Sequence, residues 1–203
     1  MFSTTKYSLL LLLCCLFLSA CSFVSPETTT NLHYLSWQQR QAELSTIKSW
    51  DIQGSLGITY DGKTDIVSFE WQNTGQNYTI DIHSPLNLAS VHIAGDAHRV
   101  MLWKSGKRCI TAATAEELMQ DQLGWSLPIS SLVYWIRALP SPASPIEFQA
   151  LDEYNHLMQL QQSGWTIQYL SFMPVDEVDL PTKMVVQSSQ VRCKIAIKKW
   201  TTI

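Results

Sequence analysis

The chain has 203 residues, of which 14 are basic and 17 acidic, and its formal net charge is −3 with histidine neutral. This weak negative charge does not favour a nucleic-acid partner. Hydrophobic residues make up 46% of the chain, which is enough for one domain with a sizeable core after an N-terminal segment is set aside.

The first twenty residues are predicted to be an export signal. Lys6 supplies a positive charge, and the apolar run Leu9–Leu18 follows it. This run is too short for the roughly 20 residues that a membrane-spanning helix needs. Leu18-Ser19-Ala20-Cys21 resembles the lipobox of bacterial lipoproteins, which implies cleavage before Cys21 and acylation of that cysteine. The alternative is an ordinary cleaved signal that leaves Cys21 as a free thiol.

We therefore expect a cleaved signal at 1–20, an acylated N-terminus with a flexible polar tether at 21–32, and one domain at 33–203. Cleavage removes one basic residue and no acidic one, so 13 basic minus 17 acidic residues leaves a net charge of −4. One acyl chain binds a bilayer marginally, but the diacylglyceryl and N-acyl groups together hold the protein there. Ser22 after the cysteine favours the outer membrane. No other cofactor is expected.

The domain is predicted to begin with an amphipathic helix over residues 33–48, with polar residues such as Arg40 between the apolar positions. From Trp50 the apolar period changes to two, which is typical of a half-buried strand. Asp61-Gly62 marks a hairpin into a returning strand. Gly54 lies in the apolar row of the first strand, where its small size permits bending.

Short strands separated by turn residues follow, at Tyr78–Ile82, Ala89–Ile93, Val100–Trp103 and Arg108–Thr111. Two helices then interrupt the series. The first has a capping box at Thr114 and Glu117, and the second runs from Pro128 to Ile136.

Strands resume after a proline-rich loop, at residues 146–151, 157–161, 165–169, 183–187 and 191–197. The predicted fold is mostly β with helices (α+β). It is a single antiparallel sheet of about 10–11 strands in meander order, curled into an incomplete barrel and covered by about three helices around a hydrophobic cavity.

A curled sheet of this size either fills its interior with its own side chains or encloses a ligand cavity. Eight tryptophans are many for this chain, and rigid rings can wall a cavity without collapsing into it. Composition alone does not distinguish tryptophans that line a ligand cavity from tryptophans that fill an ordinary packed core. Strand parity is the basis for nominating the following lining residues: Trp50, Ile52, Ile58, Phe69, Trp71, Ile80, Trp103, Trp135 and Trp165.

Pro85 and Leu86 are predicted to form the tip of a connection between two strands, because Pro85 cannot donate to a ladder. A leucine in a turn either folds back onto the core or stays exposed. Beside a lipid anchor, an exposed Leu86 could dip into a bilayer.

An ordered set of segments across the mature chain resembles the LolB family of outer-membrane lipoprotein receptors. The segments begin with Trp37-Gln38-Gln39-Arg40-Gln41, Phe69-Glu70-Trp71-Gln72 and Ser84-Pro85-Leu86. They continue with Leu123–Ile129, Trp135-Ile136-Arg137-Ala138-Leu139-Pro140, Gly164–Tyr169 and Ile195–Trp200.

The resemblance implies an antiparallel half-barrel whose cavity accepts lipoprotein acyl chains from a LolA-like periplasmic carrier. It also implies a loop with an apolar tip, matched here by Pro85 and Leu86, that helps to insert the cargo into the outer-membrane bilayer. We expect a periplasm-facing monomer. Asn87 stands where the family usually has glycine, and asparagine tolerates a left-handed turn nearly as glycine does. Ala138 stands where glycine is more usual before Leu-Pro, which bears on helix termination more than on function. Any basic rim for the carrier must be local, with Lys104, Lys107 and Arg108 as candidates.

No catalytic motif appears in the sequence, so an enzyme is not expected. The histidines have no metal spacing, although His83 and His92 could face each other across a hairpin. Asp176, Glu177 and Asp179 are interpreted as a solvated acidic loop. Cys109 and Cys193 either pair in an oxidising compartment or remain two buried apolar thiols.

Two other functions stay open beside the receptor. One is a structural or assembly lipoprotein whose solid core leaves only an outer face to bind a protein partner. The other is a hydrolase of envelope lipids. Uptake of a fluorescent acyl probe would distinguish a receptor from a scaffold, and turnover of a lipid would identify a hydrolase.

Overall fold

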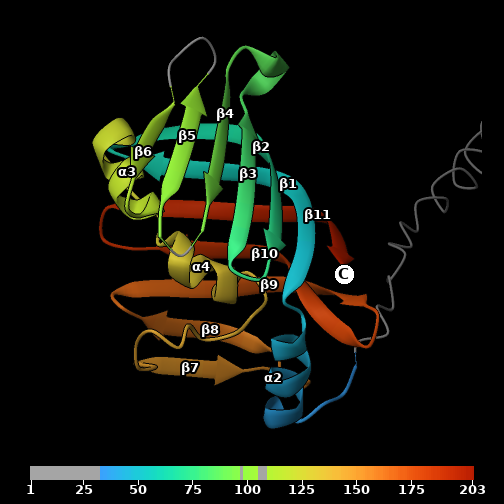
Figure 1. The fold of residues 1–203 in the computed structure, drawn as a ribbon. Helices are drawn as coiled ribbons and strands as arrows, with labels where there is room; N and C mark the ends of the chain where they lie inside the picture. Colours follow the sequence, from blue (N-terminus) through green and yellow to red (C-terminus); the bar gives the residue numbers. More distant parts are fainter. Residues whose placement is uncertain (1–32, 97, 105–108) are drawn as a thin grey trace, which may run out of the picture. The chain divides into compact units, whose positions relative to one another are not determined.

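Eleven antiparallel strands form one open sheet in the computed structural model of the chain, which describes residues 33–96, 98–104 and 109–203 (Figure 1). The signal, Cys21, the tether, Lys107 and Arg108 lie outside the described residues. The first six strands are β1 (Ser49–Tyr60), β2 (Lys63–Thr74), β3 (Asn77–His83), β4 (Ser90–Gly95), β5 (Val100–Lys104) and β6 (Ile110–Ala112). The remaining strands are β7 (Phe148–Leu151), β8 (Leu157–Gln162), β9 (Trp165–Val175), β10 (Val178–Gln187) and β11 (Val191–Thr202).

The strand order across the sheet is β6-β5-β4-β3-β2-β1-β11-β10-β9-β8-β7. Two meanders of consecutive strands are thus joined at the centre by the long pair β1–β11, in which Leu56 lies opposite Ile195. The short strands β6 and β7 are the two free edges, so the sheet does not close. This confirms the predicted single antiparallel sheet curled into an incomplete barrel.

Three α-helices accompany the sheet in the described part of the chain: α2 (Trp37–Thr46), α3 (Ala115–Leu123) and α4 (Ile129–Trp135). Helix α2 begins later than predicted, at a capping box in which Ser36 and Gln39 each accept a backbone hydrogen bond from the other. Thr114 caps α3 as predicted, by accepting from the Glu117 amide at 3.1 Å. Gly124 ends α3 with a φ of 78°, a conformation that glycine adopts without strain.

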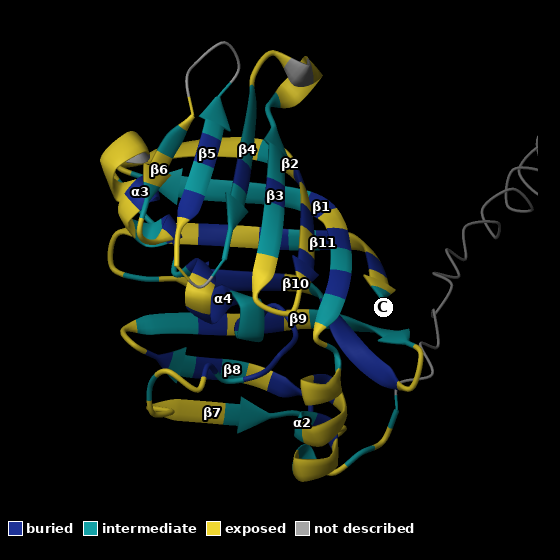
Figure 2. Cartoon of the chain, in the orientation of Figure 1, coloured by how far each residue is buried: buried dark blue, intermediate teal, exposed yellow. Residues whose placement is uncertain are grey.

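The core lies between the sheet and the helices α3 and α4, and Figure 2 shows the buried residues alternating along the central strands. Gly54 occupies a site that no side chain could share, because a Cβ there would lie 2.1 Å from the Ala196 carbonyl oxygen. The β1–β11 register shifts between Gln53 and Gly54. Gly54 therefore stands at this register shift because no larger residue fits there. No helix in the described ranges is long and apolar enough to cross a bilayer.

Candidate functional site

Alternate residues of the central strands point to the sheet face that α3 and α4 cover. The register puts Ile52 opposite Trp71, Trp71 opposite Ile80, and Ile80 opposite Ile93. All four side chains are at most 5% exposed. Since strand residues alternate between faces, these positions form one continuous apolar row across four neighbouring strands.

A small cavity of about 50 Å³ lies between this face and the helices. Its lining is wholly apolar and consists of Leu56, Ile58, Phe69, Trp71, Ile80, Ile82, Ile93, Met119, Trp125, Leu127, Ile129, Leu132, Ile136 and Ile195. This volume holds only a few water molecules and is far below the roughly 300–1,000 Å³ of ligand pockets. The predicted hydrophobic lining is therefore present around a cavity that is nearly filled in this structure.

Four of the nine nominated residues line the cavity: Ile58, Phe69, Trp71 and Ile80. Trp50 and Ile52 are buried in the adjoining core, and Trp50 packs edge-to-face against Trp71 with ring centroids 5.1 Å apart. They support the wall without forming its surface.

Trp135 and Trp165 lie further along the interior, and the cavity lining does not include them. Their ring centroids are 6.5 Å apart. The Trp135 indole donates a hydrogen bond to the buried amide oxygen of Gln162 at 2.9 Å. Trp135 therefore anchors the end of α4 to β8.

The nomination of Trp103 was wrong. Val100 and Leu102 are the buried residues of β5, so Trp103 faces the other side of the sheet. There it lies opposite His92, with ring centroids 5.2 Å apart. The run Val100–Trp103 is apolar throughout, so composition does not reveal which parity faces the interior.

Sequence reasoning missed most of the helical wall of the cavity. Ile129, Leu132 and Ile136 recur at helical spacing, which was the available signal for a lining face on α4. Ile82 follows Ile80 by two residues in β3, and Ile93 belongs to the alternating apolar row of β4, so both were also predictable. Their arrival at the same cavity as α4 depends on tertiary packing.

The loop between β3 and β4 projects from one end of the sheet (Figures 1 and 2). Pro85–Asn87 form a short 3-10 turn, and Leu86 is 90% exposed. The alternative in which Leu86 folds onto the core is therefore wrong. Leu86 itself takes the left-handed conformation, with φ 59° and ψ 18°. We expected Asn87 to accommodate such a turn in place of glycine, but the strained residue is the leucine, at a cost of about 1–2 kcal/mol.

Buried charged side chains link α2 to strand β10, and their burial contradicts two predictions from the sequence. Asp179 is fully buried and is not part of a solvated acidic loop, and Arg40 is buried although it was placed on the polar side of its helix. Arg40 Nη1 donates to Asp179 Oδ2 at 3.2 Å, and its Nη2 donates to the carbonyl oxygens of His33 and Tyr154.

Two histidines complete this buried cluster. His156 Nε2 lies 2.9 Å from Asp179 Oδ2, and its Nδ1 lies 2.9 Å from Asp152 Oδ2. The His33 backbone amide and Nδ1 lie 2.9 and 3.0 Å from the Asp179 carboxylate. Burial raises the pKa of Asp179, but the hydrogen bonds from His156 and His33 and the charge of Arg40 outweigh it, so the pKa falls below its ordinary value.

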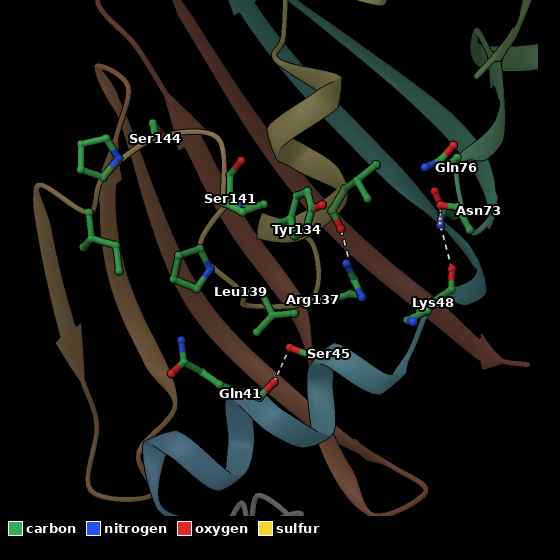
Figure 3. A pocket seen from close by; sticks show the side chains of 16 residues that line it. Gln41, Ser45, Lys48, Asn73, Gln76, Tyr134, Arg137, Leu139, Ser141 and Ser144 are labelled. Atoms are coloured by element: carbon green, nitrogen blue, oxygen red, sulfur yellow. Dashed lines mark hydrogen bonds between the residues drawn. The ribbon is translucent and has the colours of Figure 1, made fainter. Parts of the chain in front are cut away.

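A larger groove of about 740 Å³ lies outside the apolar cavity, beside α2 and the loop that follows α4 (Figure 3). Arg137 forms part of its floor, and its guanidinium donates to the carbonyl oxygens of Val133, Leu44 and Ile47. Burial lowers the pKa of this guanidinium. Among the described residues that line the groove there is no carboxylate, histidine or cysteine.

Ala138 follows α4 in a left-handed conformation, with φ 58°. The Ala138 and Leu139 amides donate to the Trp135 and Tyr134 carbonyls at 2.9 and 3.2 Å, which is the hydrogen-bond pattern of a Schellman motif. The substitution of alanine for the more usual glycine thus bears on helix termination, as predicted.

The two cysteines of the domain are both free. Cys193 is buried, and burial raises the pKa of its thiol to about 12. The structure therefore has no Cys109–Cys193 disulfide, and since Cys109 is exposed, only one of the two thiols is buried as predicted. His83 lies opposite Ser90, while His92 contacts Asp81 at 2.7 Å, so the two histidines do not face each other. No group of three or more His, Cys, Asp or Glu side chains within the described ranges is arranged so that it could hold a metal ion.

Comparisons with known proteins agree with this architecture. Residues 48–200 match the family model described as outer membrane lipoprotein LolB. The chain is 42% identical over 198 residues to the outer-membrane lipoprotein LolB of Coxiella burnetii, covering 96% of this chain and 93% of that protein. It is 34% identical over 165 residues to the protein of the same name from Nitrosococcus oceani, covering 81% and 82%.

A solved structure shares the fold without close sequence similarity. It is a LolA superfamily protein from Nitrosomonas europaea, with a TM-score of 0.52, 8% identity, and coverage of 82% of this chain and 93% of that one. The LolB match spans both meanders and the two covering helices, as the resemblance in the sequence implied. The chain belongs to the LolB family, a family of outer-membrane lipoproteins and not of enzymes.

Proposed function

We propose that this protein is an outer-membrane-anchored receptor that accepts lipoproteins from a LolA-like periplasmic carrier and inserts them into the outer-membrane bilayer. Its own anchor would be the acyl groups on Cys21, and no other cofactor is required. The proposed receptor acts as a monomer facing the periplasm. Names of the LolB relatives support the outer-membrane location.

The observation that carries this proposal is the wholly apolar lining between the sheet and the helices α3 and α4. A lipid-modified protein exposes long acyl chains, and each shielded CH₂ contributes about 0.8 kcal/mol. A site without polar groups suits such chains and offers nothing for a polar substrate. The groove of Figure 3 lies outside this lining, and it mixes amides, hydroxyls and prolines with the cationic side chains of Lys48 and Arg137 and with a few aliphatic ones.

The small cavity volume gives the proposed cycle a direction. Acyl chains enter only if α3 and α4 move away from the sheet, and Gly124 and Pro128 flank the link between these helices. The free energy needed to open the cavity offsets part of the binding free energy of the acyl chains, so it lowers the receptor's apparent affinity for them. Entry of the acyl chains into the bilayer requires no such opening. The chains would therefore pass from the receptor to the membrane without a chemical energy source. The same argument requires the carrier to bind the chains more weakly than the receptor.

The loop tip supplies the contact for release. Burying one leucine side chain contributes about 1.5–3 kcal/mol, so Leu86 could hold the receptor's tip in the bilayer while cargo leaves. The permanent anchor and tether would keep this tip beside its target at a high effective concentration. Lys104 remains a candidate for the carrier contact at the end of β5.

The decisive test is transfer. A carrier loaded with a lipoprotein is mixed with mature protein carrying Cys21→Ala, and with the same protein carrying Leu86→Glu. We expect both to take the lipoprotein, and the Leu86→Glu protein to release it poorly into liposomes. If lipoprotein stays on the carrier while the domain is folded, the receptor proposal fails.

Acyl-probe binding tests the cavity separately. Ile82 lines the cavity and Met101 faces the opposite side of the sheet. Ile82→Gln should weaken binding of a fluorescent fatty-acyl probe about tenfold, in line with the loss of one apolar contact surface. Met101→Gln should leave binding unchanged. Equal effects of both variants would contradict the proposed binding face.

The nearly filled cavity favours a second candidate, a scaffold lipoprotein with a solid core that binds a protein partner through its outer face. Such a protein takes up no acyl probe at any concentration at which it is folded. The probe experiment therefore separates the two functions without needing the carrier.

A further inference from the structure

The β3–β4 loop is held in one shape by hydrogen bonds between its two ends. The Ser84 amide donates to the Ala89 carbonyl at 2.9 Å, and the Ala89 amide donates to Ser84 Oγ at 2.8 Å. The residues between these ends are Pro85, Leu86, Asn87 and Leu88. A closed loop of this kind presents its apolar side chains without first having to order its backbone.

Leu88 is the second large apolar side chain of this loop, and it is 82% exposed. Between residues 84 and 90 the sequence contains no charged residue. Charged side chains would oppose entry into lipid, because their desolvation is costly. The loop therefore carries no charge, and its exposed residues include Pro85, Leu86, Leu88 and Ala89.

We propose that Leu88 enters the lipid bilayer together with Leu86, so that the tip of the loop is a two-leucine wedge. The inference rests on the proposed function and adds a second membrane-contacting residue to it. Two residues of extended chain span at most about 7 Å. An apolar face that lies on a membrane is buried to about 5–10 Å, so both leucines reach the same layer of the bilayer.

The paired leucines also differ from the other exposed apolar residues of the protein. Leu170 is 59% exposed on β9, in the other meander from the loop, and Figure 1 places β9 far from the loop. Gln168, two residues before it, is exposed as well. Leu170 is therefore a matched control, with the same side chain away from the loop tip.

The test uses the full acylated protein reconstituted in liposomes of bacterial phospholipids. A Cys109→Ser background removes the exposed thiol, while Cys193 is buried and Cys21 is blocked by the proposed acyl anchor. An environment-sensitive fluorophore is attached to Leu86→Cys, Leu88→Cys or Leu170→Cys. Blue shift and quenching by nitroxide-labelled lipids report entry into the bilayer.

We expect the labels at 86 and 88 to be blue-shifted and quenched, and the label at 170 to remain aqueous. A label at 88 that stays aqueous while the label at 86 is quenched overturns the two-leucine wedge and leaves the proposed function intact. If neither tip label is quenched, the wedge is also overturned, and the carrier-transfer assay decides separately whether the receptor function survives.

A second measurement avoids the label. Leu88→Ser in the Cys21→Ala protein should bind liposomes about tenfold more weakly, whereas Leu170→Ser should bind as the parent does. Both proteins should accept lipoprotein from the carrier equally. Equal liposome binding by Leu88→Ser and its parent would contradict the inference even if the protein is fully folded.

Discussion

The buried cluster around Asp179 makes a strong prediction about stability. Asp179→Asn keeps the size of the side chain but removes the charge that faces Arg40 Nη1 at 3.2 Å and His156 Nε2 at 2.9 Å. Breaking a buried ion pair by removing one partner costs about 3–5 kcal/mol, because the other charge is left uncompensated. For a domain of this size, that loss lowers the Tm by roughly 6–20 °C.

Urea unfolding followed by tryptophan fluorescence measures this loss directly. Glu177→Gln is the control, because Glu177 lies two residues away and is exposed. The double change Arg40→Met with Asp179→Leu removes both charges and should recover part of the stability. If Asp179→Asn unfolds no more easily than Glu177→Gln, the buried cluster does not stabilise the fold.

The pKa of Asp179 gives the same prediction a pH dependence. Its folded-state pKa lies below the ordinary value of 3.8. The stabilisation is therefore fully present above about pH 4 and is lost as the pH falls through the lowered folded-state pKa. The gap in unfolding free energy between the parent and Asp179→Asn should be constant from pH 5 to 7 and should narrow at pH 3. A gap that widens on acidification would refute this assignment.

Three further predictions concern the backbone and the thiols. Gly54→Ala should lower the free energy of unfolding by about 3 kcal/mol or more, because the new Cβ would lie 2.1 Å from a β11 carbonyl oxygen. Gly57→Ala is the control and should be tolerated, because the nearest atom to a Cβ at that position is 3.9 Å away. Leu86→Gly should raise the Tm, because it relieves about 1 kcal/mol of backbone strain at φ 59°, and it should also weaken liposome binding. A lower Tm would show that the backbone at Leu86 is not strained. A thiol reagent at pH 8 should modify Cys109 at once and Cys193 only after unfolding, because Cys193 is buried and burial raises the pKa of its thiol to about 12. Rapid modification of both thiols in the folded protein would show that Cys193 is accessible.

Local patterns in the sequence were sufficient for most of the elements. The capping residue Thr114, the helix end at Gly124 and the alternation through Ile52 and Trp71 each depend on near neighbours in the chain. The turn position of Leu86 was likewise visible from Pro85. The buried carboxylate of Asp179 was misread for the same reason, since the acidic residues shortly before it, Asp176 and Glu177, are exposed.

Strand β5 shows a feature that local sequence patterns do not predict, namely which of its two alternating sets of side chains faces the interior. Val100–Trp103 is apolar on both faces, so either set could have faced the interior. Pairing with β4 decides the question, because Ile93 lies opposite Leu102 and His92 lies opposite Trp103. The cavity lining could therefore be predicted only in part, and the helical wall at Leu132 required the packing of α4 on the sheet.

The sequence by itself determined the mixed fold class, the family, the capped helices and the apolar turn at Leu86. Tertiary structure alone decided that β1 pairs with β11, that Arg40 meets Asp179 across 139 residues, and that the interior is nearly filled. Side-chain periodicity specifies which face of an element is buried, but it carries no information about the partner. Partners that are distant in the sequence are selected by the combined packing and charge pairing of the whole chain.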